Sequence, residues 1–160
     1  MGNTVEYPVW EKNMERCEDE MLELSRIKSR ITKSFTYIEM DQKPFRVRTF
    51  VVKPIIKESK TLVLLHGYVS SSVFFYKMLE PLARKYRIIM FENTSHGLNS
   101  RPTECSGMES PETAEAWHTE WIDKVINATP TLPEKFLMAG HSHGGFIASL
   151  YASKRPERIE

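Results

Sequence analysis

Hydrophobic and polar positions follow three patterns along the chain, and each pattern predicts one kind of element. The first is an apolar stripe at steps of about three and four, which is typical of one face of a helix. It starts near the N-terminus and runs through Trp10, Met14, Cys17, Met21, Leu24 and Ile31. Glutamate, lysine and arginine fill the opposite face. We therefore expect a helix over residues 10–30 that packs this stripe against the rest of the protein.

The second pattern is a pair of segments rich in β-branched and aromatic residues. Residues 31–40 and 45–52 have this composition, with the polar stretch 41–44 between them. Such a pair predicts two antiparallel strands joined by a short turn. The third pattern is a continuous apolar run, which is typical of a strand buried on both faces. It occurs at residues 61–65, 87–91 and 136–139.

A helical pattern follows each apolar run, at residues 70–86, 111–128 and 146–154. Ser110 is placed to cap the second of these helices, with Pro111 at its first position. The expected inward positions are Phe74, Phe75, Met78, Leu79 and Leu82 in the first, and Trp117, Trp121, Val125 and Ile126 in the second. Alternating buried strands and helices predict an α/β fold, with a mostly parallel sheet, an N-terminal antiparallel hairpin, and helices on both faces.

Composition is consistent with one globular domain. The chain has 160 residues, of which 41% are hydrophobic and 27% charged, which is enough for a sizeable core. We expect residues 1–30 to form a helical extension and residues 31–160 to form the domain, with five strands and the helix that follows Ser142. A net charge of +1 gives no reason to expect a nucleic-acid partner.

The candidate chemistry centres on Ser142. The stretch Gly140-His141-Ser142-His143-Gly144 is a Gly-x-Ser-x-Gly motif between a predicted strand and a predicted helix. In that context it is typical of a nucleophile elbow, a strained turn that holds a serine hydroxyl above the sheet edge. A buried structural serine is the alternative, which the flanking strand and helix disfavour. A serine hydroxyl also needs an adjacent base before it can act as a nucleophile.

A second loop could complete half of an acyl-transfer site. His66-Gly67-Tyr68 directly follow the apolar run 61–65. Acyl transfer requires fixed N–H donors for the oxyanion, one of which is commonly the residue after the nucleophile. We expect the backbone N–H groups of Tyr68 and His143 to be these donors, and His66 and Gly67 to line the substrate site. A plain strand-ending turn is the alternative interpretation of this loop.

His96 lies in the loop after residues 87–91, which reaches the same edge of a parallel sheet. We expect it to shape the pocket wall and contact substrate, and a role as catalytic base is less favoured. His141 and His143 flank the serine in the turn and diverge from it. No Cys/His spacing suggests zinc and no phosphate-binding glycine loop is present, so we expect neither metal nor cofactor.

At these residues the chain resembles the α/β-hydrolase superfamily, from about residue 31 to residue 160. The His-Gly pair at 66–67, the elbow and Arg101-Pro102 carry the resemblance. The surrounding pattern is similar to a group of lipid abhydrolases: the lysophospholipase on N-acyl-phosphatidylethanolamine, a lipase coactivator with proposed lysophosphatidic acid acyltransferase activity, and cardiolipin deacylases. The resemblance implies a serine hydrolase or acyltransferase that acts on a lipid or other carboxylic ester through an acyl-enzyme at Ser142.

Two departures from the family qualify this expectation. Glu92 stands where the group usually has Asp, and Ser95 where it usually has Gly. The family's catalytic acid and histidine follow the serine in chain order, and no such pair follows Ser142 here. We therefore expect an incomplete domain with little activity by itself, and a bare sheet edge at residues 136–139. The alternative is a non-catalytic module that keeps the fold and binds a lipid or a lipase.

The expected partner is a small lipid or ester substrate. The helix over residues 10–30 could also touch a membrane or lipid droplet through Trp10, Met14 and Met21, although its acidic residues disfavour strong attraction to anionic lipid. Two cysteines, Cys17 and Cys105, favour reduced thiols rather than a disulfide framework. We expect a cytoplasmic protein, with a peripheral place at a membrane or droplet, or in the mitochondrion, as further options.

Overall fold

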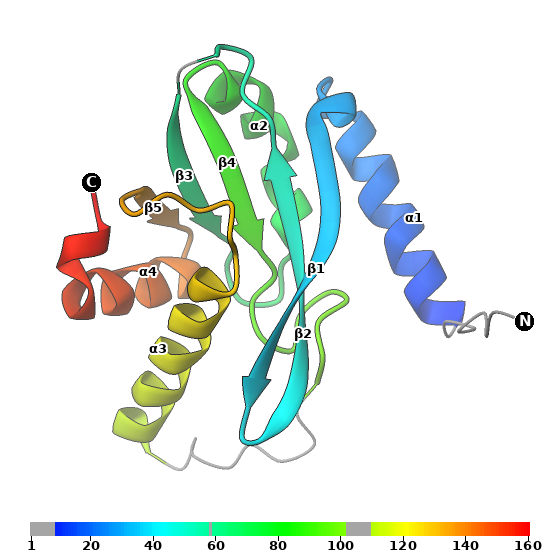
Figure 1. Ribbon diagram of the computed structural model, residues 1–160. Coiled ribbons are helices and arrows are strands. Elements are labelled where there is room, and N and C mark those ends of the chain that lie inside the picture. The colour runs from blue at the N-terminus through cyan, green and yellow to red at the C-terminus, as the bar shows by residue number, and fades with distance from the viewer. Residues whose placement is uncertain (1–8, 58, 102–109) are drawn as a thin grey trace, which may run out of the picture.

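The computed structural model describes residues 9–57, 59–101 and 110–160. Its strands are β1 (Ile31–Met40), β2 (Lys43–Val52), β3 (Lys60–Leu65), β4 (Tyr86–Phe91) and β5 (Leu137–Gly140). They form one sheet in the order β1-β2-β4-β3-β5 (Figure 1). The expected hairpin of β1 and β2 is antiparallel and joins β4 in antiparallel fashion. β4, β3 and β5 run parallel, which confirms the predicted α/β architecture.

The helices are α1 (Val9–Glu23), α2 (Tyr76–Ala83), α3 (Pro111–Asn127) and α4 (His143–Lys154). Short 3₁₀ turns lie at η1 (Lys28–Arg30), η2 (Ser72–Phe75) and η3 (Pro156–Arg158). Ser110 caps α3 as expected, because its hydroxyl accepts from the N–H of Thr113 and Pro111 follows it. The first two helices were predicted too long. α1 ends before Arg26, which has a left-handed φ of 63°, and the second helix is divided into η2 and α2.

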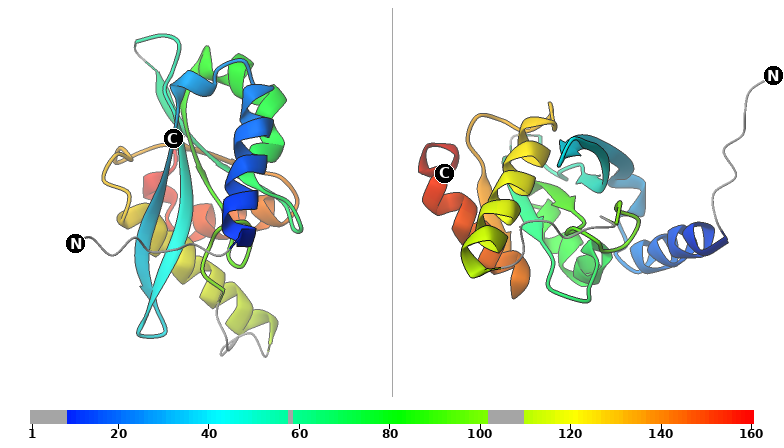
Figure 2. Two further views of the ribbon diagram at one scale, coloured as in Figure 1. Left: turned by 90° about the vertical axis from the view of Figure 1, so that its right-hand side faces the viewer. Right: turned by 90° about the horizontal axis from the view of Figure 1, so that it is seen from below.

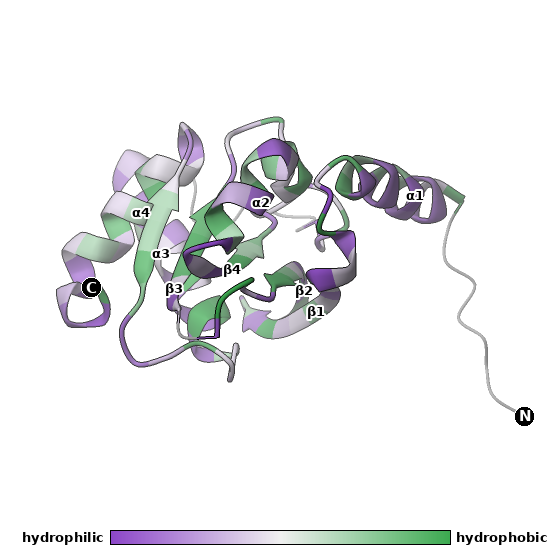
Figure 3. Cartoon of the chain, turned by 90° about the horizontal axis from the view of Figure 1, so that it is seen from above, coloured by the Kyte–Doolittle hydropathy of each residue, from purple (hydrophilic) through white to green (hydrophobic). Residues whose placement is uncertain are grey.

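Helices cover both faces of the sheet (Figure 2). α3 and α4 pack on one face, where their side chains share a core with Val63 and Leu65. α2, η2 and the C-terminal end of α1 share a second core with Leu64 on the other face. Because successive side chains of a strand point to opposite faces and helices cover both faces, the last four positions of β3 and of β4 are all hydrophobic (Figure 3). Trp121 and Val125 of α3 are fully buried, as predicted.

The face that α1 buries overlaps the predicted one but is rotated from it: Met14 and Met21 are half-buried, and Met21 packs on the core. Its buried residues are Glu18 and Leu22, whereas Trp10 is 45% exposed and Leu24 is 60% exposed. The Arg48 guanidinium of β2 donates to Glu18 Oε2, from Nη2 at 2.6 Å and from Nε at 3.2 Å. Arg48 is itself buried, and a buried cation without a partner costs several kcal/mol. Pairing of charges therefore decides which side of α1 faces the sheet.

A second correction concerns the edge at β5. Phe136, just before this strand, is fully buried and forms an isolated parallel bridge with Ile159. The Phe136 N–H donates to the Arg158 carbonyl at 3.0 Å, and the Glu160 N–H donates to the Phe136 carbonyl at 3.1 Å. The expectation of a bare edge is therefore wrong at Phe136. Within the described residues, β5 itself pairs only with β3.

Across the described ranges, no helix has the length and apolar character needed to cross a membrane. Two residues used in the sequence analysis, Pro102 and Cys105, lie outside these ranges.

Candidate active site

Ser142 occupies a strained turn between β5 and α4. Its φ is 52° and its ψ is −119°, and its side chain makes no capping hydrogen bond to the helix that it begins. A left-handed φ at a non-glycine residue costs about 1–3 kcal/mol and is typical of functional sites. A Cβ on Gly144 would lie closer than 3.0 Å to the carbonyl oxygens of Leu65 and His66. Only glycine allows the elbow to pack this closely on the end of β3.

The carboxyl ends of three parallel strands meet beside this turn. Leu65 pairs in register with Phe91 on one side and with Gly140 on the other. The His141 N–H donates to the Leu65 carbonyl at 3.0 Å, which ties the elbow to the start of the β3 loop. A Cβ on Gly67 would meet the His141 ring. The fold therefore places the loop after β3 directly against the predicted nucleophile.

Both predicted oxyanion donors have an uncommitted N–H. Within the described residues, neither the Tyr68 nor the His143 amide donates to another backbone group. His143 is the first residue of α4, where helical amides lack intrahelical partners and the helix dipole favours negative charge. Tyr68 is followed by Val69, whose φ of 50° is unusual for a β-branched residue. Their function as oxyanion donors stays a prediction.

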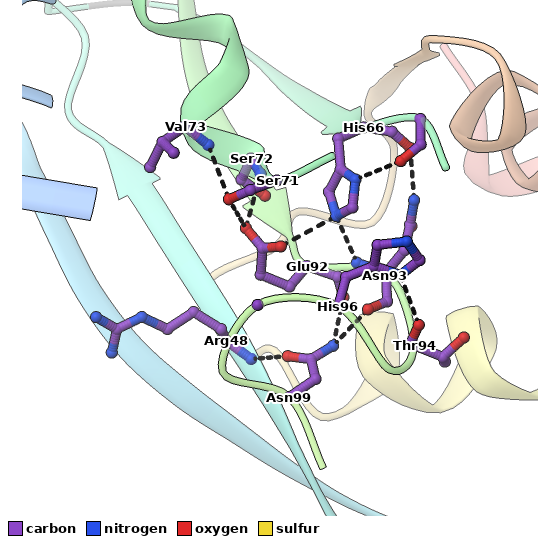
Figure 4. A network of polar contacts seen from close by, with 12 residues as sticks. Arg48, His66, Ser71, Ser72, Val73, Glu92, Asn93, Thr94, His96 and Asn99 are labelled. Carbon is purple, nitrogen blue, oxygen red and sulfur yellow. Dashed lines mark hydrogen bonds and ion pairs between the residues drawn. The ribbon is translucent and has the colours of Figure 1, made fainter. Parts of the chain in front are cut away.

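His66 lies inside the protein rather than on the substrate face. Its ring is fully buried, and Nδ1 lies 2.7 Å from the Gly67 carbonyl oxygen. On the other side of the ring, Nε2 accepts from the backbone N–H of Asn93 at 2.9 Å and lies 3.1 Å from Glu92 Oε2 (Figure 4). The ring therefore bridges the loops after β3 and β4. Substrate contact by Gly67 and His96 stays a prediction.

Glu92 is the buried anion at the centre of these loops. Its Oε1 accepts from the Ser71 hydroxyl at 2.8 Å and from the Ser72 N–H at 2.7 Å. Burial raises the pKa of Glu92, but the neighbouring His66 together with the Ser72 and Ser71 donors outweighs burial and lowers the pKa below its usual 4.5. Glu92 is therefore a carboxylate at neutral pH. The sequence analysis noted Glu92 only as a departure from the family. An acidic residue directly after one strand and a His-Gly pair directly after the neighbouring strand could have indicated this buried contact from the sequence.

His96 connects the loop after β3 to the loop after β4 through hydrogen bonds. Its Nε2 accepts from the Val69 N–H at 3.0 Å, and its Nδ1 lies 2.7 Å from the Thr94 carbonyl oxygen. Both ring nitrogens are thus committed to the backbone. The Tyr68 ring, which is 73% exposed, packs edge-on against His96. Neither ring nitrogen of His96 is therefore free to accept a proton from Ser142, and its place in the pocket wall stays a prediction.

Its place on a helix with Trp117 and Trp121 makes His118 a surface or packing histidine by sequence, and in the structure it packs against the elbow from α3. Its ring lies 4.9 Å from the His143 ring, centroid to centroid. Burial, and secondarily His143, lowers the pKa of His118 from 6.5 to about 4, so its imidazole is neutral at pH 7. Within the described residues, none of the five histidines is hydrogen-bonded to Ser142 Oγ. The arrangement presents a nucleophile and N–H donors without a base in contact.

Several known proteins with similar sequences are named as lipid enzymes. The chain is 35% identical over 100 residues to a 1-acylglycerol-3-phosphate O-acyltransferase of Arabidopsis thaliana, which covers 62% of this chain and 23% of that protein. It is 27% identical over 116 residues to a (lyso)-N-acylphosphatidylethanolamine lipase of Mus musculus, which covers 72% of this chain and 32% of that protein. The chain thus spans about a quarter to a third of the length of such relatives.

Solved structures agree on the fold. Naproxen esterase of Bacillus subtilis superposes with a TM-score of 0.71 at 20% identity, over 96% of this chain and 48% of that one. Carboxylesterase CesB of the same organism superposes with a TM-score of 0.67 at 22% identity, over 94% of this chain and 47% of that one. The model of the alpha/beta hydrolase fold family matches residues 60–160. The chain belongs to the alpha/beta hydrolase fold family.

Proposed function

We propose that Ser142 is the nucleophile of an acyl-transfer reaction on a lipid or other carboxylic ester. The observation that carries this proposal is the geometry of Ser142, which is exposed at φ 52° between β5 and α4, in an elbow whose Gly144 packs against the end of β3. The lipid class is supported by the acyltransferase and the lipase among the relatives. Whether water or an alcohol accepts the acyl group distinguishes a hydrolase from an acyltransferase.

In this mechanism Ser142 Oγ attacks the ester carbonyl carbon, and the carbonyl oxygen becomes an oxyanion held by the N–H groups of Tyr68 and His143. Collapse of the tetrahedral intermediate breaks the ester bond and leaves an acyl-serine. A base must take the Ser142 proton and return it to the departing alcohol. Because no histidine of the described residues is hydrogen-bonded to Ser142 Oγ, we propose that residues 1–160 alone turn esters over slowly.

Labelling with an alkyl fluorophosphonate tests the nucleophile directly, because the probe bonds covalently to a nucleophilic serine. The chain should be labelled slowly at Ser142, as identified by peptide mass spectrometry, because no histidine of the described residues is hydrogen-bonded to Ser142 Oγ, and Ser142→Ala should not be labelled. Ser149→Ala is the matched control, since Ser149 is an exposed serine of α4 whose hydroxyl donates to the Gly145 carbonyl. Equal labelling of Ser142→Ala and the wild type would show that the nucleophile has been misassigned.

A non-catalytic binding module is the second candidate. It is favoured by one observation, that no base contacts Ser142 Oγ within the described residues. This candidate predicts saturable binding of a lysophospholipid with no ester cleavage and no fluorophosphonate labelling. Measuring all three on the same preparation separates the two functions.

We also propose that the outward face of α1 contacts a lipid surface. Trp10 is exposed on this helix and Leu24 is exposed directly after it, and the acidic residues Glu11 and Glu18 are turned inward to Arg46 and Arg48. That inward pairing reduces the negative charge that would oppose lipid contact. Co-sedimentation with phosphatidylcholine vesicles should fall in a Trp10→Ala/Leu24→Ala variant. Tyr37 is a more exposed aromatic residue, on β1, and Tyr37→Ala should bind as the wild type does.

A further inference from the structure

The His66 ring controls the direction of one peptide bond. Its Nδ1 lies 2.7 Å from the Gly67 carbonyl oxygen, inside the protein. A carbonyl oxygen only accepts hydrogen bonds, so Nδ1 carries a proton and donates it. This requirement holds for the neutral ring and for the imidazolium alike. Only the tautomer with its single proton on Nε2 is excluded.

The carbonyl of Gly67 and the N–H of Tyr68 belong to the same planar peptide unit. In a trans peptide these two groups point in opposite directions, and the described residues contain no cis peptide bond. Because His66 draws the carbonyl inward, the Tyr68 N–H is directed away from the buried ring. That direction leads toward the side where Tyr68 is 73% exposed. A rotation of this peptide would bury the N–H and turn the carbonyl outward.

The far side of the ring is also held in place. Nε2 accepts from the backbone N–H of Asn93 at 2.9 Å. Glu92 Oε2 lies 3.1 Å from Nε2 and forms an ion pair only with a protonated ring, and the Glu92 carboxylate accepts from the Ser71 hydroxyl and the Ser72 N–H (Figure 4). His66 and Glu92 are both fully buried. The His66 ring cannot turn without breaking contacts on both sides, so its hydrogen bond holds the Gly67 carbonyl in one orientation.

We propose that His66 is a positioning residue that orients the Gly67–Tyr68 peptide and thereby presents the Tyr68 N–H to an oxyanion. The inference rests on the proposed function, in which that N–H is one of two donors. In this proposal the His66 side chain lies in the protein interior, and Glu92 helps to hold its ring in place. The peptide direction itself is a property of the fold that can be measured without any reaction.

The first measurement uses the wild-type chain labelled with ¹⁵N and ¹³C. Long-range ¹H–¹⁵N spectra should show a protonated Nδ1 on His66, with a scalar coupling through the hydrogen bond to the Gly67 carbonyl carbon. The Tyr68 amide should exchange with solvent as an unprotected N–H. A neutral ring protonated only at Nε2, or a strongly protected Tyr68 amide, would overturn the proposal.

The second measurement compares two near-isosteric variants. In His66→Asn the side-chain amide nitrogen replaces Nδ1, whereas in His66→Gln the amide replaces Nε2 and the donor to Gly67 is lost. Both remove one side of the ring contacts, so a purely structural role predicts similar losses of stability and of labelling. Loss of one oxyanion donor lowers rates by roughly 10²–10³-fold. We therefore expect fluorophosphonate labelling of Ser142 to fall about 100-fold in His66→Gln and less than about 10-fold in His66→Asn, at equal folded fractions.

Equal labelling rates in the two variants would overturn the positioning role. Absence of labelling in the wild-type chain would instead remove the proposed function. The direction of the Gly67–Tyr68 peptide is then decided by the spectra of the wild type alone, so the two failures are distinguishable.

Discussion

Replacing Arg48 by methionine tests the charge pairing that holds α1 on the sheet. Arg48 and Glu18 are each 3% exposed. Without the guanidinium, the closest remaining cation to Glu18 is the Lys33 ammonium, at 3.8 Å from Oε2. Glu18 Oε1 already has no partner among the described residues. Removal of one member of such a buried pair typically costs about 3–5 kcal/mol.

Protonation of Glu18 sets an upper limit on that cost. The usual pKa of the group is 4.5, and burial raises the pKa of Glu18 even beside Arg48. At about 1.4 kcal/mol per pH unit, neutralising the carboxylate at pH 7 costs about 3.4 kcal/mol, and at pH 5 less than about 1 kcal/mol. In the variant the folded state binds this proton more tightly than the unfolded state, so stability rises as the pH falls from 7 to 5. We expect Arg48→Met to lower the free energy of unfolding by about 3 kcal/mol at pH 7 and about 1 kcal/mol at pH 5.

Urea unfolding at pH 5, 6 and 7 measures this difference, with Glu18→Gln as the matched control. That variant carries no titrating group at position 18, and Arg48 keeps Glu15 as a partner at 3.3 Å. Its penalty should be smaller, about 1–2 kcal/mol, and constant across this pH range. A penalty for Arg48→Met that is the same at pH 5 and pH 7 would refute the reasoning. It would mean that the Glu18 carboxylate becomes solvent-exposed and stays charged in the variant instead of binding a proton.

Two further predictions concern the elbow and its neighbour. Gly144→Ala should destabilise the protein by more than about 2 kcal/mol and abolish fluorophosphonate labelling, because the new methyl group meets the backbone of β3. Gly145→Ala, whose closest contact would be 3.2 Å to the Gly140 carbonyl oxygen, should cost less, and a reversed order in urea unfolding would contradict the proposed packing. The pKa of His118 is lowered to about 4 by burial and then by His143, so the unfolded state binds more protons and stability is lost as the pH falls from 6.5 toward 4. His118→Gln should flatten this part of the pH profile, and an unchanged slope would show that His118 is not buried as a neutral ring.

The sheet and the elbow were predictable because local pattern and tertiary burial agree there. Strands β3 and β4 lie between two helical layers, so burial on both faces makes them continuous apolar runs. The elbow combines a strand, a strained serine and glycines at the points of closest approach, and these requirements act within a few residues. Sequence reasoning therefore located Ser142 and the loop that faces it.

The face of α1 was not predictable from periodicity. Two stripes of this helix have helical spacing, an apolar one through Trp10 and an acidic one through Glu18. The choice between them depends on Arg48, thirty residues away in the sequence and buried only after the hairpin forms. The inward direction of His66 is similar, because it depends on Glu92 and Asn93 from the loop after another strand. Pairings of this kind are set by tertiary contacts that no local pattern reports.

The left-handed backbone at Val69 has a consequence for engineering this protein. A β-branched side chain that is 80% exposed gains little from packing, yet its φ of 50° costs about 1–3 kcal/mol. Glycine or asparagine at this position would adopt the same backbone with less strain, so stability-guided redesign would select the substitution first. The relief would also loosen the loop that His66 and His96 hold in one orientation. At position 69, the residue that gives the most stable protein therefore differs from the residue that keeps the site loop in one orientation. Selection for stability at this position works against the order of the site.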